Sequence, residues 1–448
     1  MVIPPEVLAL IQGLEGRGYQ AWVVGGCVRD DFLGLTPHDW DICTDATPQE
    51  TAACFSEYPL ILAGEKHGTV GVVTSGGPVE ITTFRREGDY ADGRHPGWVQ
   101  FTRTVEADLA RRDFTINAMA YSPSRGLADP FGGRRDLEAG ILRTVGRPED
   151  RFREDGLRIL RGVRFAARLS LQPEAETLGA MTGLASSLAN QARERVYSEL
   201  CGFLPWAKAG ALITFAPVVT AAVPALAPCL GFAQHNPHHI YDVYTHTAHV
   251  VDNAPPRLPV RWAALLHDVA KPACFTTDGQ GVGHFWGHGK QGGEMARRIL
   301  AELRAPRIIQ EQVATLVAYH GLTRELSGSD RGIARLLRKL GEPAVWDLLA
   351  LDIADDSGKG TPPDVAPFQQ FRQRLTDILA AEPCLDRRQL AVGGQELMAL
   401  AQGPALGRLL NRLLEEVGDG VLENSKPALL ARAAQLVEGE AECTKPNK

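Results

Sequence analysis

The stretch GGCVRDDFLGLTPHDWDICT, which runs from Gly25 to Thr44, organises the rest of the chain. It opens with two glycines after an apolar run, and glycines at the end of a strand let backbone N–H groups approach a phosphate closely because no Cβ intervenes. Near its end, Asp39 and Asp41 stand two positions apart, and on a strand such positions face the same way. The stretch therefore predicts a phosphate-binding turn followed by a strand that presents two carboxylates to one site.

Two carboxylates on one face are the ligands that a pair of Mg²⁺ ions needs for in-line phosphoryl or nucleotidyl transfer. A polar strand end with two solvated acids is the competing interpretation, because an Asp-x-Asp pair is common by itself. The glycine pair, the Arg29–Asp30 pair and Thr44 favour the metal site. Trp40 and Ile42 are then expected to face the core on the other side of the strand.

Length and composition describe an ordinary globular protein. A chain of 448 residues is too long for one core and suggests roughly two to four domains. The net charge of −7 gives no overall sign of nucleic-acid binding, so any RNA site must be a local basic patch. The eight cysteines are scattered without a CxxC pair, which favours a reducing, cytoplasmic compartment. The N-terminus has no signal-peptide pattern, and prolines interrupt the uncharged run 210–232, so we expect short buried helices there and no membrane span.

The first part of the chain has the pattern of a small mixed α/β unit. An amphipathic helix is expected at 4–17, a capping box at 47–50 begins another helix, and strands are expected at 69–74 and 79–84. Glu80, in the second of these strands, is a candidate third carboxylate, although a half-exposed strand acid explains it equally well.

A further motif, RRDFTINA, lies in the segment 107–121, whose moderately apolar pattern predicts a helix. Arg112 and Asp113 could bind a triphosphate and ribose hydroxyls by charge-assisted hydrogen bonds, and Asn117 lies within two turns of them. A surface ion pair between adjacent residues is the structural alternative. The segment 129–146 is expected to form a turn and a hairpin.

Arginines dominate the next segment, where the pattern REDGLRILRGVRFAARL predicts one continuous helix. Glu154, Asp155 and Arg158 would share one face of it, and ordinary ion pairs on such a face are worth little. The alternative is a protein template for a nucleobase. A carboxylate accepts from the exocyclic amino group of C or A, and an arginine donates to the ring nitrogen or carbonyl beside it, whereas G and U present the opposite pattern. We favour the template.

A second site is expected where the histidines gather, because nine of the twelve lie between residues 235 and 320. The pair His267–Asp268 ends an apolar helical run. With His246 upstream and Asp355 downstream, it resembles the H…HD…D pattern of the HD phosphohydrolases.

Imidazole and carboxylate ligands suit a divalent transition metal or Mg²⁺. His288 and His320 are candidates for holding a second metal or a substrate phosphate. Asp352, one helical turn before Asp355, is the rival fourth ligand. Three other histidines are interpreted as structural: His235, His238 and His249.

The motifs of the first 200 residues together resemble one family. The stretch 25–44, RRDFTINA at 111–118 and the EDxxR spacing at 154–158 are similar to those of class II tRNA CCA-adding enzymes and bacterial poly(A) polymerases. The resemblance implies Mg²⁺ bound by Asp39 and Asp41, with Glu80 as the third catalytic carboxylate. It implies a nucleotide bound by Gly25, Gly26, Arg29, Arg112, Asp113, Asn117, Glu154, Asp155, Arg158 and Arg161.

The resemblance also gives a role to the polar, glycine-rich segment 85–99, which we interpret as a mobile loop. In the family a similar loop is needed for the final A addition, which makes Asp92, Arg94 and His95 candidate participants; a plain surface loop is the competing interpretation. RERVYSEL at 193–200 matches the next family motif and is expected to brace the template helix.

The expected fold is α+β, a small mixed α/β nucleotidyltransferase head followed by all-helical neck, HD and tail regions. The expected domains are a head (1–145), a helical neck with the template and RNA contacts (146–235), an HD domain (236–360) and a tRNA-binding helical body and tail (361–448).

The expected function is addition of C, C and A to the 3′ end of tRNA from CTP and ATP, with a second, HD-type phosphohydrolase activity. No DNA partner is expected, and the oligomeric state stays open. The alternatives are a poly(A), CC-only or A-only polymerase, or an HD phosphohydrolase with a vestigial head. Retention of both Asp39 and Asp41 argues against the vestigial head and against a non-catalytic RNA-binding module.

Overall fold

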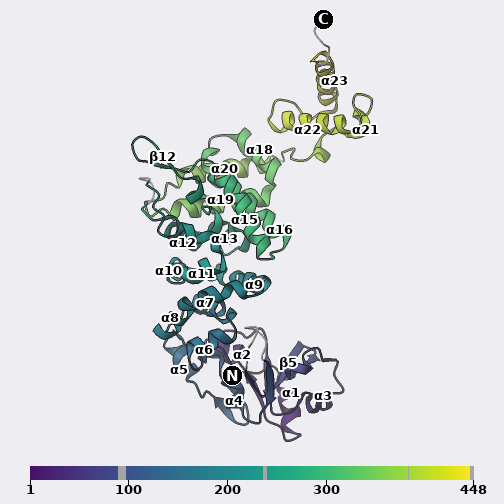
Figure 1. The fold of residues 1–448 in the computed structure, drawn as a ribbon. Coiled ribbons are helices and arrows are strands. Elements are labelled where there is room, and N and C mark those ends of the chain that lie inside the picture. Colours follow the sequence, from purple (N-terminus) through teal and green to yellow (C-terminus); the bar gives the residue numbers. More distant parts are fainter. Residues whose placement is uncertain (89–96, 236–239, 382, 444–448) are drawn as a thin grey trace. The chain divides into compact units, whose positions relative to one another are not determined.

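The computed structural model describes residues 1–88, 97–235, 240–381 and 383–443. The chain divides into two compact units, Met1–Ala227 and Pro228–Lys448, called here the N-terminal unit and the C-terminal unit (Figure 1). All strands of the central sheet belong to the N-terminal unit, and helices make up most of the C-terminal unit. The expected fold class, an α/β head followed by helical regions, is confirmed.

The head is built on a seven-stranded sheet with the order β3-β4-β5-β2-β1-β8-β9. β1 runs antiparallel to both β2 and β8, whereas β2 and β5 are parallel. This parallel pair sets Asp41 directly opposite Glu80. The strands are β1 Ala21–Val24, β2 Asp41–Thr44, β3 Leu60–Ile61, β4 Thr69–Thr74, β5 Gly77–Thr83, β8 Ala120–Ser122 and β9 Gly126–Ala128.

Apolar side chains cover both faces of this sheet. On one face, α1 (Pro5–Glu15) packs with Ile42, and Trp40 lies against the same cluster, as the alternation predicts. On the other face, Trp22 and Cys43 pack against α4 (Val105–Leu109). The expected capping box begins α3 (Pro48–Cys54) and is confirmed, because the Thr47 hydroxyl accepts from the Glu50 N–H while the Glu50 carboxylate accepts from the Thr47 N–H.

Two expected elements of the head are wrong. Segment 107–121 is not one helix, since α4 ends at Leu109, a 3-10 turn η2 follows (Thr115–Asn117), and then β8. The backbone is extended at Phe114 and bridges to Thr144, and the buried Phe114 ring packs on two other phenylalanines. Segment 129–146 forms the helix α5 (Gly133–Glu138) and β10 (Ile141–Leu142), because Asp129 accepts from the first backbone N–H groups of that helix.

Two paired strands bound the segment 85–99, which was expected to be a loop. β6 (Arg85–Gly88) pairs antiparallel with β7 (Trp98–Phe101), and Arg85 stands opposite Phe101. Asp92, Arg94 and His95 lie outside the described residues.

The helical part of the N-terminal unit contains the template segment, which is two helices rather than one. α6 (Pro148–Glu154) ends before Asp155, whose backbone is extended (φ −144°, ψ 106°), and α7 (Leu157–Leu169) begins after Gly156. The Asp155 carboxylate accepts from the Leu157 N–H at 3.0 Å and so replaces the missing helical hydrogen bond.

The remaining elements of this unit are short. They are β11 Gln172–Pro173, α8 Ala175–Gly183, η3 Ala185–Asn190, α9 Arg193–Phe203, η4 Leu204–Trp206, α10 Ala209–Thr214, α11 Ala216–Ala222 and η5 Pro224–Cys229, whose last two residues belong to the C-terminal unit. The last three occupy most of the uncharged run 210–232, so the short helices expected there are confirmed. None of the helices in the described part of the chain combines the length and apolar character of a membrane span.

The C-terminal unit is helical. α13 packs against α12, α16 and α19 and carries the fully buried Trp262. Its elements are α12 Val243–Asn253, α13 Leu258–Leu266, α14 Lys271–Cys274, β12 Thr276–Thr277, β13 Gly283–His284, α15 His288–Glu302, α16 Arg307–Tyr319, α17 Leu322–Glu325, α18 Asp330–Leu340, α19 Glu342–Ser357, α20 Ala366–Ala380, η6 Arg387–Gln389, α21 Gly394–Leu397, α22 Pro404–Gly418 and α23 Lys426–Cys443.

Candidate active sites

The three head carboxylates meet at the start of β2. Asp41 is its first residue and is paired in register with Glu80 of β5. Asp39 precedes the strand rather than lying on it, which corrects the expectation that both aspartates share a strand face. Desolvation raises the pKa of Asp41, Arg112 opposes this shift, and the negative charges of Glu80 and Asp39 add to it. Carboxylates that destabilise one another's charge in this way fit a divalent cation.

The glycine turn brings an arginine next to these carboxylates. Gly25 has φ +81°, and its N–H donates to the Met119 carbonyl at 3.0 Å. The positive φ requires glycine here, and a Cβ would in addition lie 2.8 Å from an Arg112 guanidinium nitrogen, which would have to move. Gly26 then begins α2 (Gly26–Phe32).

A buried polar network runs from α2 to α7. Arg29 donates to Asp30 (2.6 Å) and to the Asn117 amide oxygen (2.6 Å). The Asn117 amide nitrogen donates to Asp113 at 3.3 Å, and Asp113 accepts from Arg161 at 2.7 Å. Burial alone would raise the pKa of Asp113, but Arg161 outweighs it and lowers that pKa to about 2. Asp113 is therefore an anion at neutral pH, and Arg29 acts on Asn117 rather than pointing freely into solvent.

The template residues are held from several sides. Arg158 donates to Glu154 (2.5 Å) and to the carbonyls of Arg151 and Arg111 (3.3 Å each). Because the helix breaks at Asp155, that residue does not share a helical face with Arg158, contrary to expectation.

The expected brace for this segment is present. Arg195 of RERVYSEL donates to the second oxygen of the Asp155 carboxylate at 2.9 Å, and Glu199 of the same motif accepts from Arg164 of α7 at 2.6 Å.

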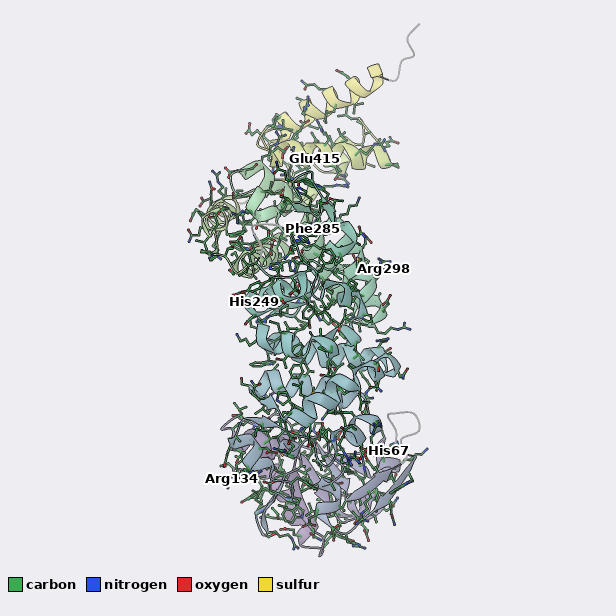
Figure 2. The ribbon with its side chains drawn as sticks, turned by 60° about the vertical axis from the view of Figure 1, so that its left-hand side comes forward. His67, Arg134, His249, Phe285, Arg298 and Glu415 are labelled. Carbon is green, nitrogen blue, oxygen red and sulfur yellow. The ribbon has the colours of Figure 1, made fainter. Side chains whose placement is uncertain are left out.

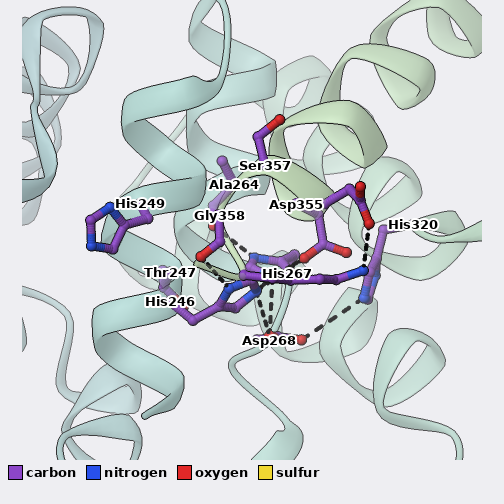
Figure 3. Close-up of polar contacts among 12 residues, drawn as sticks. His246, Thr247, His249, Ala264, His267, Asp268, His320, Asp355, Ser357 and Gly358 are labelled. Atoms are coloured by element: carbon purple, nitrogen blue, oxygen red, sulfur yellow. Dashed lines mark hydrogen bonds and ion pairs between the residues drawn. The ribbon is translucent and has the colours of Figure 1, made fainter. Parts of the chain in front are cut away.

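The histidine site gathers side chains from three helical segments (Figure 3). His246 comes from α12, His267 and Asp268 follow α13, and Asp355 comes from α19. The Nε2 atoms of His246 and His267 are 3.3 Å apart, and an Asp355 oxygen lies 3.0 Å from His246 Nε2. Ligand atoms of His246, His267 and Asp355 all lie within 4.8 Å of one another.

A second set of ligand atoms shares this centre. Asp268, His288 and His320 also offer ligand atoms within 4.8 Å of one another. One Asp268 oxygen lies 3.1 Å from His267 Nε2, and the other lies 3.6 Å from His288 Nε2. Asp268 therefore stands between the two sets.

The hydrogen bonds of the histidines orient all four imidazoles for metal binding. Their Nδ1 atoms lie 2.6–3.2 Å from the backbone carbonyls of Gly358, Ala264, Phe285 and Val317. A carbonyl only accepts, so each Nδ1 carries the proton and each Nε2 turns a lone pair toward the centre. The Lys271 ammonium lies 2.7 Å from one buried Asp268 oxygen, and among the described residues the other oxygen has no hydrogen-bond donor. A buried cluster of acceptors fits one or two cations.

Charges inside the cluster shift its pKa values strongly. Burial lowers the pKa of His267, but Asp268 outweighs it and raises that pKa above its usual range. Burial and the neighbouring imidazoles lower the pKa of His320 to about 4. Burial would raise the pKa of Asp355, yet His246 and His267 hold it well below its usual range.

Sequence reasoning did not single out Lys271, which lies four residues after His267 in HDVAK. Its ammonium is 2.7 Å from an Asp268 oxygen, donates to Gln234 at 2.7 Å, and lies 5.2 Å from the ring centroid of Phe285, which is labelled in Figure 2. Lys271 lies three residues after Asp268, and this spacing is the feature of the sequence that could have identified it.

Asp352, the rival ligand, lies outside both metal-compatible sets. Its carboxylate accepts from the Gly321 N–H (2.7 Å) and from the Thr323 N–H and hydroxyl (3.0 and 2.6 Å). Burial raises the pKa of Asp352 to about 7, against these hydrogen bonds. His249 points away from the cluster in Figure 3 and stacks on Tyr241 at 4.5 Å, which agrees with a structural role.

Comparison with known protein families identifies two segments. Residues 21–143 match the family described as "Poly A polymerase head domain". Residues 285–433 match the family described as "tRNA nucleotidyltransferase domain 2 putative".

Whole-length relatives and solved structures agree with these matches. The chain is 31% identical to the CCA-adding enzyme of Lacticaseibacillus paracasei over 445 residues, 96% of each chain, and 32% identical to that of Streptococcus mutans over 434 residues, 95% of each. The crystal structure of the Bacillus stearothermophilus CCA-adding enzyme in complex with CTP superposes with a TM-score of 0.73 at 28% identity, covering 98% of this chain and 100% of that one. A Thermotoga maritima CCA-adding enzyme complexed with tRNA shares the fold, with a TM-score of 0.61 at 21% identity over 97% of this chain and 96% of that one. The chain therefore belongs to the family of CCA-adding enzymes, which are nucleotidyltransferases.

Proposed function

We propose that this chain adds C, C and A to the 3′ end of tRNA from CTP and ATP, with its chemistry at Asp39, Asp41 and Glu80. The observation that supports this most is the parallel pairing of β2 and β5, which sets Asp41 opposite Glu80 with Asp39 beside them. Mg²⁺ held by these carboxylates would polarise the α-phosphate and the attacking 3′-hydroxyl. In the reaction, the tRNA 3′-hydroxyl attacks the α-phosphate and pyrophosphate leaves.

The neighbouring residues would bind and select the nucleotide. The turn at Gly25 and Gly26 offers backbone N–H groups for a phosphate, and Arg112 supplies positive charge beside it. Asp113 and Asn117, oriented by Arg161 and Arg29, would receive the ribose hydroxyls, and Arg112 would contact the triphosphate. Asp155 and Arg158 would read the Watson–Crick edge of the base.

A poly(A), CC-only or A-only polymerase is the alternative within the same chemistry. The intact EDxxR motif and the retained segment that carries Asp92 and Arg94 support full CCA addition.

The test offers a tRNA transcript without its 3′ end to the protein, with each labelled nucleotide alone and with CTP plus ATP, and sizes the products. Wild-type protein should add three nucleotides, and Asp41→Asn should add none while still binding tRNA. Glu57→Gln, at an exposed carboxylate of the same unit, is the matched control and should behave as wild type. Near-normal addition by Asp41→Asn would overturn the assignment.

We also propose that the histidine site is an HD-type, metal-dependent phosphohydrolase centre. The supporting observation is that four Nε2 lone pairs and two carboxylates converge in a buried place. His246, His267, Asp268 and Asp355 would hold one divalent ion, and His288 and His320 would hold a second, shared through Asp268. Four imidazoles favour a transition metal over Mg²⁺. Lys271 would stabilise negative charge on a bound phosphate.

Hydrolysis of 2′,3′-cyclic and monoester phosphates, with and without a chelator, tests this second activity. His267→Ala should abolish hydrolysis and keep nucleotide addition, because the two sites lie in different units. His249→Ala is the matched control, since this histidine of α12 stacks on Tyr241 outside the cluster. Full hydrolysis by His267→Ala would refute the proposal.

The wider expectations stay predictions. They are the domain division 1–145, 146–235, 236–360 and 361–448, tRNA binding by the last of these, and a cytoplasmic location. Seven of the eight cysteines are free thiols, in keeping with a reducing compartment: Cys27, Cys43, Cys54, Cys201, Cys229, Cys274 and Cys384.

A further inference from the structure

One buried phenylalanine is the meeting point of three arginines. The guanidinium carbons of Arg29, Arg161 and Arg164 lie 5.3, 5.6 and 4.4 Å from the ring centroid of Phe165. Arg29 comes from α2 in the head, and the other two come from α7. The ring is 5% exposed, and its contact with the Phe114 ring (5.9 Å, 81°) fixes its plane.

The ring is not needed to balance the arginine charges. Arg29 pairs with Asp30 (2.6 Å), Arg161 with Asp113 (2.7 Å) and Arg164 with Glu199 (2.6 Å). Arg161 and Arg164 each hold their carboxylate through one donor nitrogen, whereas Arg29 holds Asp30 through two nitrogens and Asn117 through a third. A ring face attracts each cation through its quadrupole and further restricts its orientation, more strongly where water is excluded.

Two of these arginines end on residues of the nucleotide site. Arg29 donates to Asn117, and Arg161 donates to Asp113. Asn117 and Asp113 are joined to each other at 3.3 Å, and the Asn117 carbonyl lies 3.7 Å from the Cβ position of Gly25. The orientation set at the ring is therefore transmitted to the two side chains beside the glycine turn.

We propose that Phe165 is a positioning residue for nucleotide binding, acting through cation–π contacts that orient Arg29 and Arg161. This inference rests on the proposed assignment of Asp113 and Asn117 to the nucleotide. It predicts that the electron density of the ring, and not only its volume, controls the affinity for CTP and ATP alike. Within the described residues, neither Asp155 nor Arg158 of the base template makes a cation–π contact with this ring, so the preference between the two nucleotides should not change.

Fluorinated phenylalanines test this, because fluorine withdraws electron density from the ring face and leaves its volume nearly the same. Phe165 is replaced in the full-length protein by 4-fluoro-, 3,5-difluoro- and 3,4,5-trifluorophenylalanine. Single-turnover kinetics give Kd for CTP and ATP separately from the chemical step. Both Kd values should rise stepwise with each fluorine, by about fivefold or more in total, while their ratio stays constant.

The same series at Phe152 is the matched control. This ring is 1% exposed and packs on Phe114 at 6.5 Å, but within the described residues no cation lies over it. Unchanged Kd values along the Phe165 series, or an equal rise along the Phe152 series, would overturn the inference while leaving nucleotide addition intact. If the unsubstituted protein adds no nucleotide, the proposed function fails instead.

Discussion

Arg195→Ala is expected to weaken base selection without touching the nucleotide. The Asp155 carboxylate, which we propose accepts from the amino group of C or A, is fixed by two donors, the Leu157 N–H at 3.0 Å and the Arg195 guanidinium at 2.9 Å. Removing Arg195 leaves only the first donor. The carboxylate then keeps its place in the chain but rotates more freely, so its bond to the correct base is formed less often.

The size of the effect follows from the bonds involved. A good bidentate contact discriminates between bases by about 1–3 kcal/mol, so Asp155→Ala should reduce the preference for CTP over UTP roughly tenfold to hundredfold. A hydrogen bond to a charged group is worth about 1.5–3 kcal/mol, but the Leu157 bond remains, so Arg195→Ala should lose about 1 kcal/mol of discrimination, or roughly fivefold. Arg193 lies in the same helix and donates only weakly, to the Ala189 carbonyl at 3.5 Å, which makes Arg193→Ala the matched control.

The measurement is the ratio of kcat/KM for all four nucleotides on one tRNA. The expected order of lost selectivity is Asp155→Ala first, Arg195→Ala second, and Arg193→Ala indistinguishable from wild type. Equal ratios in all three variants and wild type would place base reading elsewhere and reduce this segment to a scaffold. Equal losses for the two arginine variants would mean that general destabilisation, and not the bond to Asp155, caused the change.

Three further perturbations probe other parts of the two sites. Gly25→Ala should lower nucleotide addition sharply, because φ +81° strains alanine by about 1–3 kcal/mol and its Cβ would meet a guanidinium at 2.8 Å; normal kinetics would contradict the need for glycine there. Despite burial, Arg161 lowers the pKa of Asp113 from 3.8 to about 2, so this stabilisation is present above pH 3.8 and is lost as the pH falls toward 2. Asp113→Asn should therefore flatten the acid side of the unfolding free-energy curve by roughly 2 kcal/mol, measured by urea unfolding at several pH values. Asp355→Asn should lower the metal content of the purified protein, whereas Asp352→Asn should keep the metal and lower the Tm; mass-spectrometric metal analysis that finds the reverse would exchange their roles.

Short-range sequence patterns correctly predicted those elements of the head that neighbouring residues determine. The capping box at Thr47 and the strands at 69–74 and 79–84 follow from side-chain chemistry and alternation, and the structure has them within two residues of the expected bounds. The alternation of Trp40 and Ile42 toward the core also follows, although Asp39 lies just before the strand. The register of the strands could not be predicted in this way, because the pairing of Asp41 with Glu80 joins segments that are far apart in the chain.

The two helices that were predicted wrongly share one cause. Both are interrupted by tertiary contacts, which the spacing of apolar residues along the chain does not reveal. The pattern of 153–169 is helical throughout, but the Asp155 side chain accepts from the Leu157 N–H and from Arg195, and the backbone at Asp155 is extended. Segment 107–121 likewise reads as a helix until the burial of Phe114 between other aromatic rings is considered. In both places tertiary contacts override a local propensity, and both places lie within the candidate nucleotide site.

The chemistry of the two ligand sets suggests how one chain would keep the two proposed reactions apart. The head offers only carboxylate oxygens, which suit a hard ion such as Mg²⁺, whereas the second centre offers four oriented imidazoles, which suit a transition metal. The surroundings strengthen this difference. The head carboxylates oppose one another's charge at an edge that is open to a nucleotide, so their affinity for metal depends on the phosphates that arrive with it. At the second centre, Asp268 is 1% exposed and the protein supplies six ligand groups, so a metal ion would need no ligand from a substrate. The rate of nucleotide addition would then depend on the concentration of nucleotide-bound Mg²⁺. The rate of hydrolysis would depend on the fraction of protein that holds a metal ion at the second centre.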